Sequence, residues 1–272
     1  MSGAGPHDER GAGGSAPHGG DGTMDEESSS DARPHGIEFA IDPSQVLRIL
    51  LSIIGLLVAL STATQAMVHY LPDFPLRDRT ANLFYVDIEQ SVPTLYSSVM
   101  LLISALLFGV ITYAHRRGGH PFVRHWGALS LVFSLLALDE FASLHEQTVE
   151  PLRAVLDIEG GPLWFAWVVP AAVAVALFGI AFARFLGHLP RATRRLLSAA
   201  AILFVGGAIG VELVGASYSA VHGQLDFTWV LITTVEESLE MLGIAVLVYA
   251  LLAYVPVGFP DVVWRLRVTP SD

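Results

Sequence analysis

Carboxylic acids recur inside three apolar segments of this sequence, where lipid-facing helices normally carry none. The segments lie at about 126–148, 195–220 and 229–253. The acids are Asp139, Glu140 and Glu146 in the first, Glu212 in the second, and Glu236, Glu237 and Glu240 in the third. Carboxylates bind hard divalent cations, and inside membranes they also relay protons. Metal binding and proton or cation transfer are therefore the chemistries that these residues suggest.

The spacing of the acids in 229–253 predicts one acidic helix face. At about 100° of turn per residue, Glu240 projects between Glu236 and Glu237, and the three fall within an arc of roughly 100°. In 126–148, Asp139, Glu140 and Glu146 share an arc of about 120°, together with Ser143 and Gln147. His145 projects to nearly the opposite side of an ideal helix. We expect His145 to join the acids only if its helix distorts or ends there.

Energetics make this cluster more than an accident of composition. Each acid near the bilayer centre costs roughly 2.5–3.5 kcal/mol on insertion scales, so five cost on the order of 12–17 kcal/mol. Water in a cavity, protonation or bound cations can offset that cost. Acids that share one layer in the outer half of the membrane favour protonation or a divalent metal ion.

The sequence thus predicts a site for a divalent metal ion inside the membrane. The pattern does not specify which metal. The predicted ligands are Asp139, Glu140, Glu212, Glu236, Glu237 and Glu240, with His145, Glu146 and His69 as weaker candidates. Ser97 and Ser98 are candidates for assisting proton transfer in catalysis. The protein would then be a membrane-embedded enzyme or metal-binding protein, acting on a lipid-like or small cationic substrate from the outer leaflet.

Three alternatives remain open on the residues alone. The same acids suit a small proton- or cation-coupled transporter or channel. They also suit a structural or partner-binding membrane protein whose acids pair with arginines of another chain. Finally, the acids near the interface could be hydrated and the others neutral packing elements.

Six apolar segments are long enough to span the hydrocarbon core, at 46–70, 93–114, 126–148, 163–186, 195–220 and 229–253. They predict an all-α polytopic bundle of about six transmembrane helices in the cell membrane. Arginines gather in alternate loops, which predicts that both termini are cytoplasmic. Trp164, Trp167 and Trp229 fall at the outer boundary, as an interfacial aromatic belt would. Pro170 should kink the fourth helix, and Ser91 should cap the second.

Composition excludes several other classes. The chain is 53% hydrophobic and only 15% charged, too apolar for a soluble domain of 272 residues. It has no cysteine, which excludes disulfides, thiolate metal sites and cysteine nucleophiles. Residues 1–45 hold nine acids and two arginines, and we expect a disordered cytoplasmic tail that does not bind nucleic acid. The transmembrane domain is then 46–254, followed by a short cytoplasmic tail at 255–272. Oligomeric state is not readable.

Four motifs resemble a set of uncharacterised bacterial multi-pass membrane proteins. They are Pro93-Thr94-Leu95-Tyr96-Ser97-Ser98, Asp139-Glu140 followed by His145-Glu146, Glu212, and Glu236-Glu237-Ser238-Leu239-Glu240-Met241. The likeness covers roughly residues 46–255. It implies a membrane location and carries no established activity.

Overall fold

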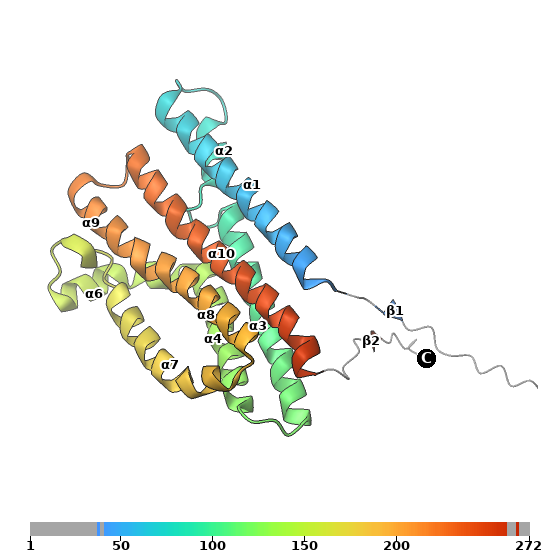
Figure 1. Cartoon of the computed structure of the whole chain (residues 1–272). Helices are drawn as coiled ribbons and strands as arrows, with labels where there is room; N and C mark the ends of the chain where they lie inside the picture. Colours follow the sequence, from blue (N-terminus) through green and yellow to red (C-terminus); the bar gives the residue numbers. More distant parts are fainter. Residues whose placement is uncertain (1–36, 39–40, 260–264, 267–272) are drawn as a thin grey trace, which may run out of the picture. The chain divides into compact units, whose positions relative to one another are not determined.

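The computed structural model describes residues 37–38, 41–259 and 265–266, and it is an all-α bundle over its main part (Figure 1). Most of the predicted tail at 1–45 and most of 255–272 lie outside the described residues, and α1 already begins at Pro43. The long elements are α1 (Pro43–Tyr70), α3 (Val92–Arg117), α4 (Val123–Ala142), α7 (Val168–His188), α8 (Arg191–Val205), α9 (Glu212–His222) and α10 (Phe227–Gly258).

The remaining elements are short. They are α2 (Arg77–Phe84), α5 (Leu144–Gln147), α6 (Val149–Leu156), the 3₁₀ turn η1 (Gly161–Leu163), the π-helical turn η2 (Gly206–Val211), and the strands β1 (Ile37–Glu38) and β2 (Arg265–Leu266), which pair. We call the end of the bundle with α2, α5 and α6 the α6 end. We call the opposite end, where the α3–α4 and α7–α8 turns lie, the arginine-rich end.

Five helical stretches are long and apolar enough to cross a membrane, with α8, η2 and α9 counting as one. A sixth forms if α4 is joined to α5–α6, but that pair bends by 70° at its break. The predicted number of about six spans therefore agrees with the structure. The length and composition of these helices are those of an integral membrane protein.

Helix starts follow local capping chemistry. The side chain of Ser91 accepts a hydrogen bond from the Thr94 backbone N–H, as the sequence predicted, and Pro93 lies in the first turn. The predicted kink at Pro170 is wrong, because α7 begins only at Val168. Pro170 therefore lies in a first turn, where its missing N–H breaks no helical hydrogen bond.

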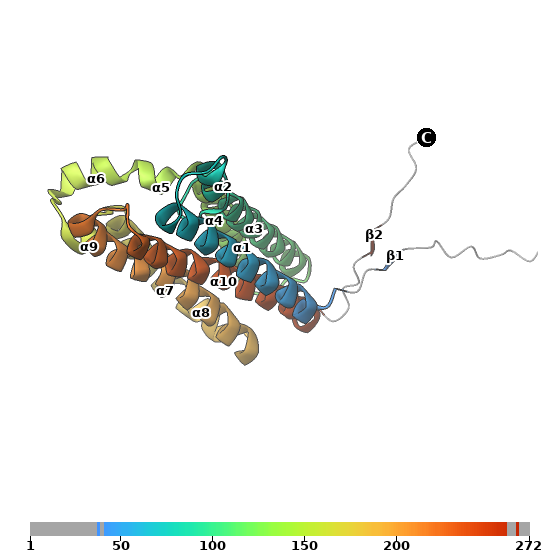
Figure 2. The same ribbon diagram turned by 90° about the horizontal axis from the view of Figure 1, so that it is seen from above.

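Helix α10 is the central element, since it packs against α1, α3 and α8 (Figure 2). Small residues allow its closest approaches. A Cβ on Gly243 would lie 2.7 Å from the Phe204 backbone nitrogen, so α8 reaches the backbone of α10 there. Helix α7 is more loosely attached, and it joins the bundle mainly near its two ends.

Candidate functional site: an acidic cavity at the α6 end

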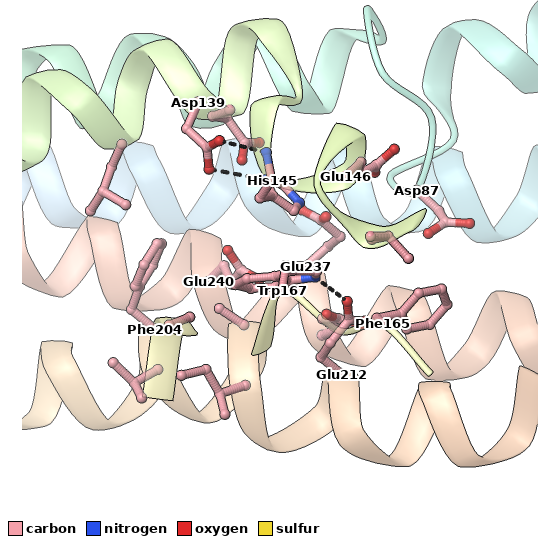
Figure 3. A pocket seen from close by; sticks show the side chains of 18 of the residues that line it. Asp87, Asp139, His145, Glu146, Phe165, Trp167, Phe204, Glu212, Glu237 and Glu240 are labelled. Carbon is pink, nitrogen blue, oxygen red and sulfur yellow. Dashed lines mark hydrogen bonds and ion pairs between the residues drawn. The ribbon is translucent and has the colours of Figure 1, made fainter. Parts of the chain in front are cut away.

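A cavity of about 530 Å³ lies between α4, α7, η2, α9 and α10 (Figure 3). Among the residues that the structure describes, its lining includes one histidine and no arginine. The acids in that lining are Asp87, Asp139, Glu140, Glu146, Glu150, Glu212, Glu236, Glu237 and Glu240. The structure thus brings the predicted metal ligands of three different spans into one cavity.

The three acids of α10 enter this cavity from the first half of their helix. The N-terminus of α10 is fixed by Asp226, which accepts a hydrogen bond of 2.8 Å from the Trp229 backbone N–H. Glu236 is 9% exposed, and Glu237 and Glu240 are half-buried. Their shared face follows from the helical spacing, so this part of the site was readable from the sequence.

Glu212 reaches the cavity through the π-helical turn η2, which directly precedes it. The wider turn contains Gly207, whose missing side chain lets η2 approach α10. A Cβ there would lie 2.7 Å from the Glu236 carbonyl oxygen and 2.9 Å from Cγ of Glu240. The Trp167 indole N–H donates a hydrogen bond of 2.9 Å to Oε1 of Glu212 (Figure 3). Glu212 is therefore pressed against the acidic face of α10 and held in orientation.

His145 joins the acids because its helix ends early. Helix α4 stops at Ala142, and Ser143 takes the left-handed conformation with φ of 48°. The chain then folds back, so Nδ1 of His145 lies 3.0 Å from one carboxylate oxygen of Asp139. The backbone N–H of His145 donates to the other Asp139 oxygen at 2.9 Å. The helix predicted over about 126–148 is broken at Ser143, so the distortion that His145 needed is present.

The mouth of the cavity contains the weaker candidate Glu146, together with Asp87 and Glu150, which the sequence did not single out. Asp87 lies between α2 and α3, and the Trp229 indole N–H donates to it at 2.9 Å. Glu146 and Glu150 come from α5 and α6, and all three of these acids keep exposed surface. Glu150 is paired with Arg153 at 2.8 Å. The cavity therefore opens at the α6 end, and most of its mouth is negative.

Asp87 differs electrostatically from an ordinary surface acid. It keeps accessible surface on the cavity, yet the surrounding protein removes much of its bulk water. This desolvation raises the pKa of Asp87 to about 6, against the opposing effect of its hydrogen bond from Trp229. Asp87 thus changes charge close to neutral pH. Nothing in the local sequence marks it, because its environment is made by α10 and the α5–α6 segment.

Three weaker candidates lie elsewhere. His69 has its ring nitrogens 2.8 Å from the Gln65 carbonyl oxygen and 3.2 Å from that of Leu225, and it is not on the cavity lining. Ser98 donates to the Thr94 carbonyl oxygen at 2.9 Å. The hydroxyl of Ser97 is buried without a hydrogen-bond partner in the described part of the chain, and neither serine lines the cavity.

The carboxylates surround a space and do not converge on one point. Within the residues that the structure describes, no group of three or more His, Asp or Glu side chains has a metal-binding arrangement. A cation here would be reached by carboxylates from several sides, across water or after small side-chain rotations. Cations that keep part of their water shell, as Mg²⁺ does, suit such spacing.

Large apolar side chains close the cavity toward the arginine-rich end. A buried cluster there includes Phe108 of α3, Trp126 of α4, Phe185 of α7 and Tyr254 of α10. Trp126 and Phe108 are each 1% exposed, and the Trp126 ring packs against Phe185 with centroids 4.9 Å apart. Apolar side chains therefore fill the bundle on the arginine-rich side of the acidic cavity.

Comparison with known proteins identifies a family, and the description of that family names no activity. The sequence model of the family described as "Domain of unknown function (DUF8692)" matches residues 50–255, which take in the whole cavity lining. No curated protein matches the chain. No solved structure matches it either.

Proposed function

The chain belongs to this DUF8692 family, and we propose that it is a membrane protein that binds cations in the acidic cavity at the α6 end. One observation carries the proposal: nine acids and a single histidine line one cavity of about 530 Å³. Cations that bind there offset the mutual repulsion and the desolvation of carboxyl groups crowded together away from bulk water.

A divalent metal ion is the cation that we expect. Carboxylate oxygens are hard ligands, and the deep acids Glu140, Glu212, Glu236, Glu237 and Glu240 offer up to ten of them. His145 is held by Asp139 and stands beside these acids. The proposal is for binding, and not for a serine-assisted hydrolysis, because Ser97 and Ser98 do not line the cavity.

Closure at the arginine-rich end favours one-sided binding over transport. A transporter must open the same site to both sides in turn. Here the cluster that contains Trp126 and Phe185 fills the far half of the bundle, and α10 carries no acid beyond Glu240. The arginine distribution predicts that the arginine-rich end is cytoplasmic, so the cavity would take cations from the outer side.

Vesicles with the protein inserted in one known orientation test this proposal. We expect Mn²⁺ added on the α6 side to bind with saturation, measured by its electron paramagnetic resonance signal, without entering the vesicle lumen. Mn²⁺ added only on the arginine-rich side should stay free. Saturable Mn²⁺ entry into the lumen would replace the binding proposal with transport, and no binding from either side would overturn it.

A further inference from the structure

The acidic cavity has a second, chemically different end. Beyond the acids, its wall is built by apolar side chains of α4, α7, α8 and η2. They include Leu136, Ala171, Val175, Phe204, Ala208 and Ile209. Figure 3 shows Phe204 at one end of the cavity and Phe165, Asp87 and Glu146 at the other, with Glu237 and Glu240 between them. A metal ion would gain nothing from contact with this apolar wall, whereas an alkyl chain would pack against it.

Aromatic rings stand beside the acids near the mouth. The indoles of Trp167 and Trp229 both line the cavity, and each donates its N–H to a carboxylate, on Glu212 and Asp87 respectively. Phe165 lies next to Trp229 with ring centroids 6.1 Å apart. Aromatic rings combined with carboxylates are the usual surroundings of a bound organic ammonium group.

Glu236 lacks a positive partner. It is 9% exposed and lines the cavity, and in the described part of the chain no arginine pairs with it. Its side-chain contact is another carboxyl group, that of Glu212. Two carboxyl groups in contact away from bulk water must share a proton or a cation, because two negative charges there repel each other. A cation that enters the cavity would therefore bind between them.

We infer that the ligand of this cavity is an amphipathic organic cation, with an ammonium head among the carboxylates and an alkyl chain along the apolar wall. This rests on the proposed function, because the head uses the same acids. The two ends of the cavity match the two ends of such a molecule in charge and polarity. The volume of about 530 Å³ also falls in the range of small-molecule sites.

A series of alkyltrimethylammonium ions tests the inference on the full chain in lipid nanodiscs. Binding of tetramethyl-, hexyltrimethyl- and decyltrimethylammonium is measured below their micelle concentrations, with empty nanodiscs and decanol as controls for partition into lipid. We expect affinity to rise at least ~100-fold from the shortest to the longest ion, since each buried methylene favours binding about fourfold. The longest ion should also displace bound Mn²⁺.

Variants of the apolar wall separate this site from lipid partition. Ala171→Phe and, independently, Val175→Phe fill the apolar end and should remove most of the gain with chain length. Val173→Phe is the matched control, because Val173 lies on the same helix, is 56% exposed and does not line the cavity. Thermal unfolding of each variant shows whether it is folded.

The outcomes distinguish the two proposals. Mn²⁺ binding with no effect of chain length would overturn the amphipathic ligand and leave cation binding intact. Absence of binding by Mn²⁺ and by every ammonium ion would overturn both. The third outcome is that the rise in affinity with chain length is lost in Val173→Phe but kept in Ala171→Phe and Val175→Phe. That result would assign the effect to the lipid-facing surface and would also overturn the inference.

Discussion

At the scale of single residues, most carboxyl groups of the cavity have no basic partner inside the described bundle; Asp139, beside His145, and Glu150, beside Arg153, are exceptions. Arg77 and Arg153 pair with Asp73, Asp78 and Glu150, which leaves the deeper acids without an arginine. Removing a negative charge from the cavity should therefore lower cation affinity without destabilising the fold, because the carboxylates repel one another when no cation is present.

Glu237→Gln tests this directly. The change removes one negative charge and keeps the shape of a side chain that lines the centre of the cavity. We expect Mn²⁺ affinity to fall by at least ~10-fold, comparable to the loss of one charged partner in a polar site, while membrane insertion stays intact. Calorimetry in nanodiscs measures it. Glu159→Gln, at an exposed acid outside the cavity lining, is the matched control and should bind as the wild type does.

Asp87 predicts how binding depends on pH. Because its pKa is raised to about 6, Asp87 is largely neutral below pH 5 and charged above pH 7. Cation affinity should therefore rise as the pH increases through 6, and Asp87→Asn should remove that part of the rise. Asn keeps an oxygen that can accept the hydrogen bond from Trp229. Identical pH profiles for the two proteins between pH 5 and 7 would contradict the role given to Asp87.

At the scale of elements, regular helices were predictable and their interruptions were not. The face shared by Glu236, Glu237 and Glu240 follows from helical periodicity, and the cap at Ser91 follows from its hydroxyl and the proline two residues later. The left-handed Ser143 and the π-helical turn η2 depend on what packs around them. Sequence periodicity assumes an unbroken helix, so it placed His145 on the wrong side.

Gly207 provides the sharpest test of the η2 turn. Gly207→Ala would place a Cβ against the Glu236 carbonyl oxygen and Glu240, forcing η2 away from α10. We expect a loss of about 1–3 kcal/mol in the free energy of unfolding, as for other overpacked positions, with weaker cation binding. Gly206→Ala, one residue earlier, meets nothing within 4 Å and should be neutral or slightly stabilising. Equal effects of the two changes would argue against the close approach of η2 and α10.

At the scale of the whole molecule, the number of spans was set by length and hydropathy alone. The composition of the cavity mouth could not be predicted from length and hydropathy, because Asp87, Trp167 and Trp229 come from segments far apart in the sequence. The tryptophans were predicted as interfacial residues, and the structure shows that two of them also bind carboxylates. Their second role depends on tertiary contacts, which no single segment reveals.

Orientation in the membrane can be measured without removing any native thiol, because the chain has no cysteine. Single cysteines at Glu159, near α6, and at Gly119, between α3 and α4, would lie at opposite ends of the bundle. From the arginine distribution we expect an impermeant maleimide to label Glu159→Cys in intact cells and Gly119→Cys only after lysis. The reversed pattern would place the cavity mouth on the cytoplasmic side.

The most direct test of the central claim is elemental analysis of the purified protein after equilibration with Mn²⁺ and removal of free ions. If the acids of separate helices form one cation site, the wild type should retain close to one Mn²⁺ per chain. The double variant Glu236→Gln and Glu240→Gln should retain almost none while staying folded. Equal Mn²⁺ content in the two folded proteins, or none in the wild type, would contradict the claim.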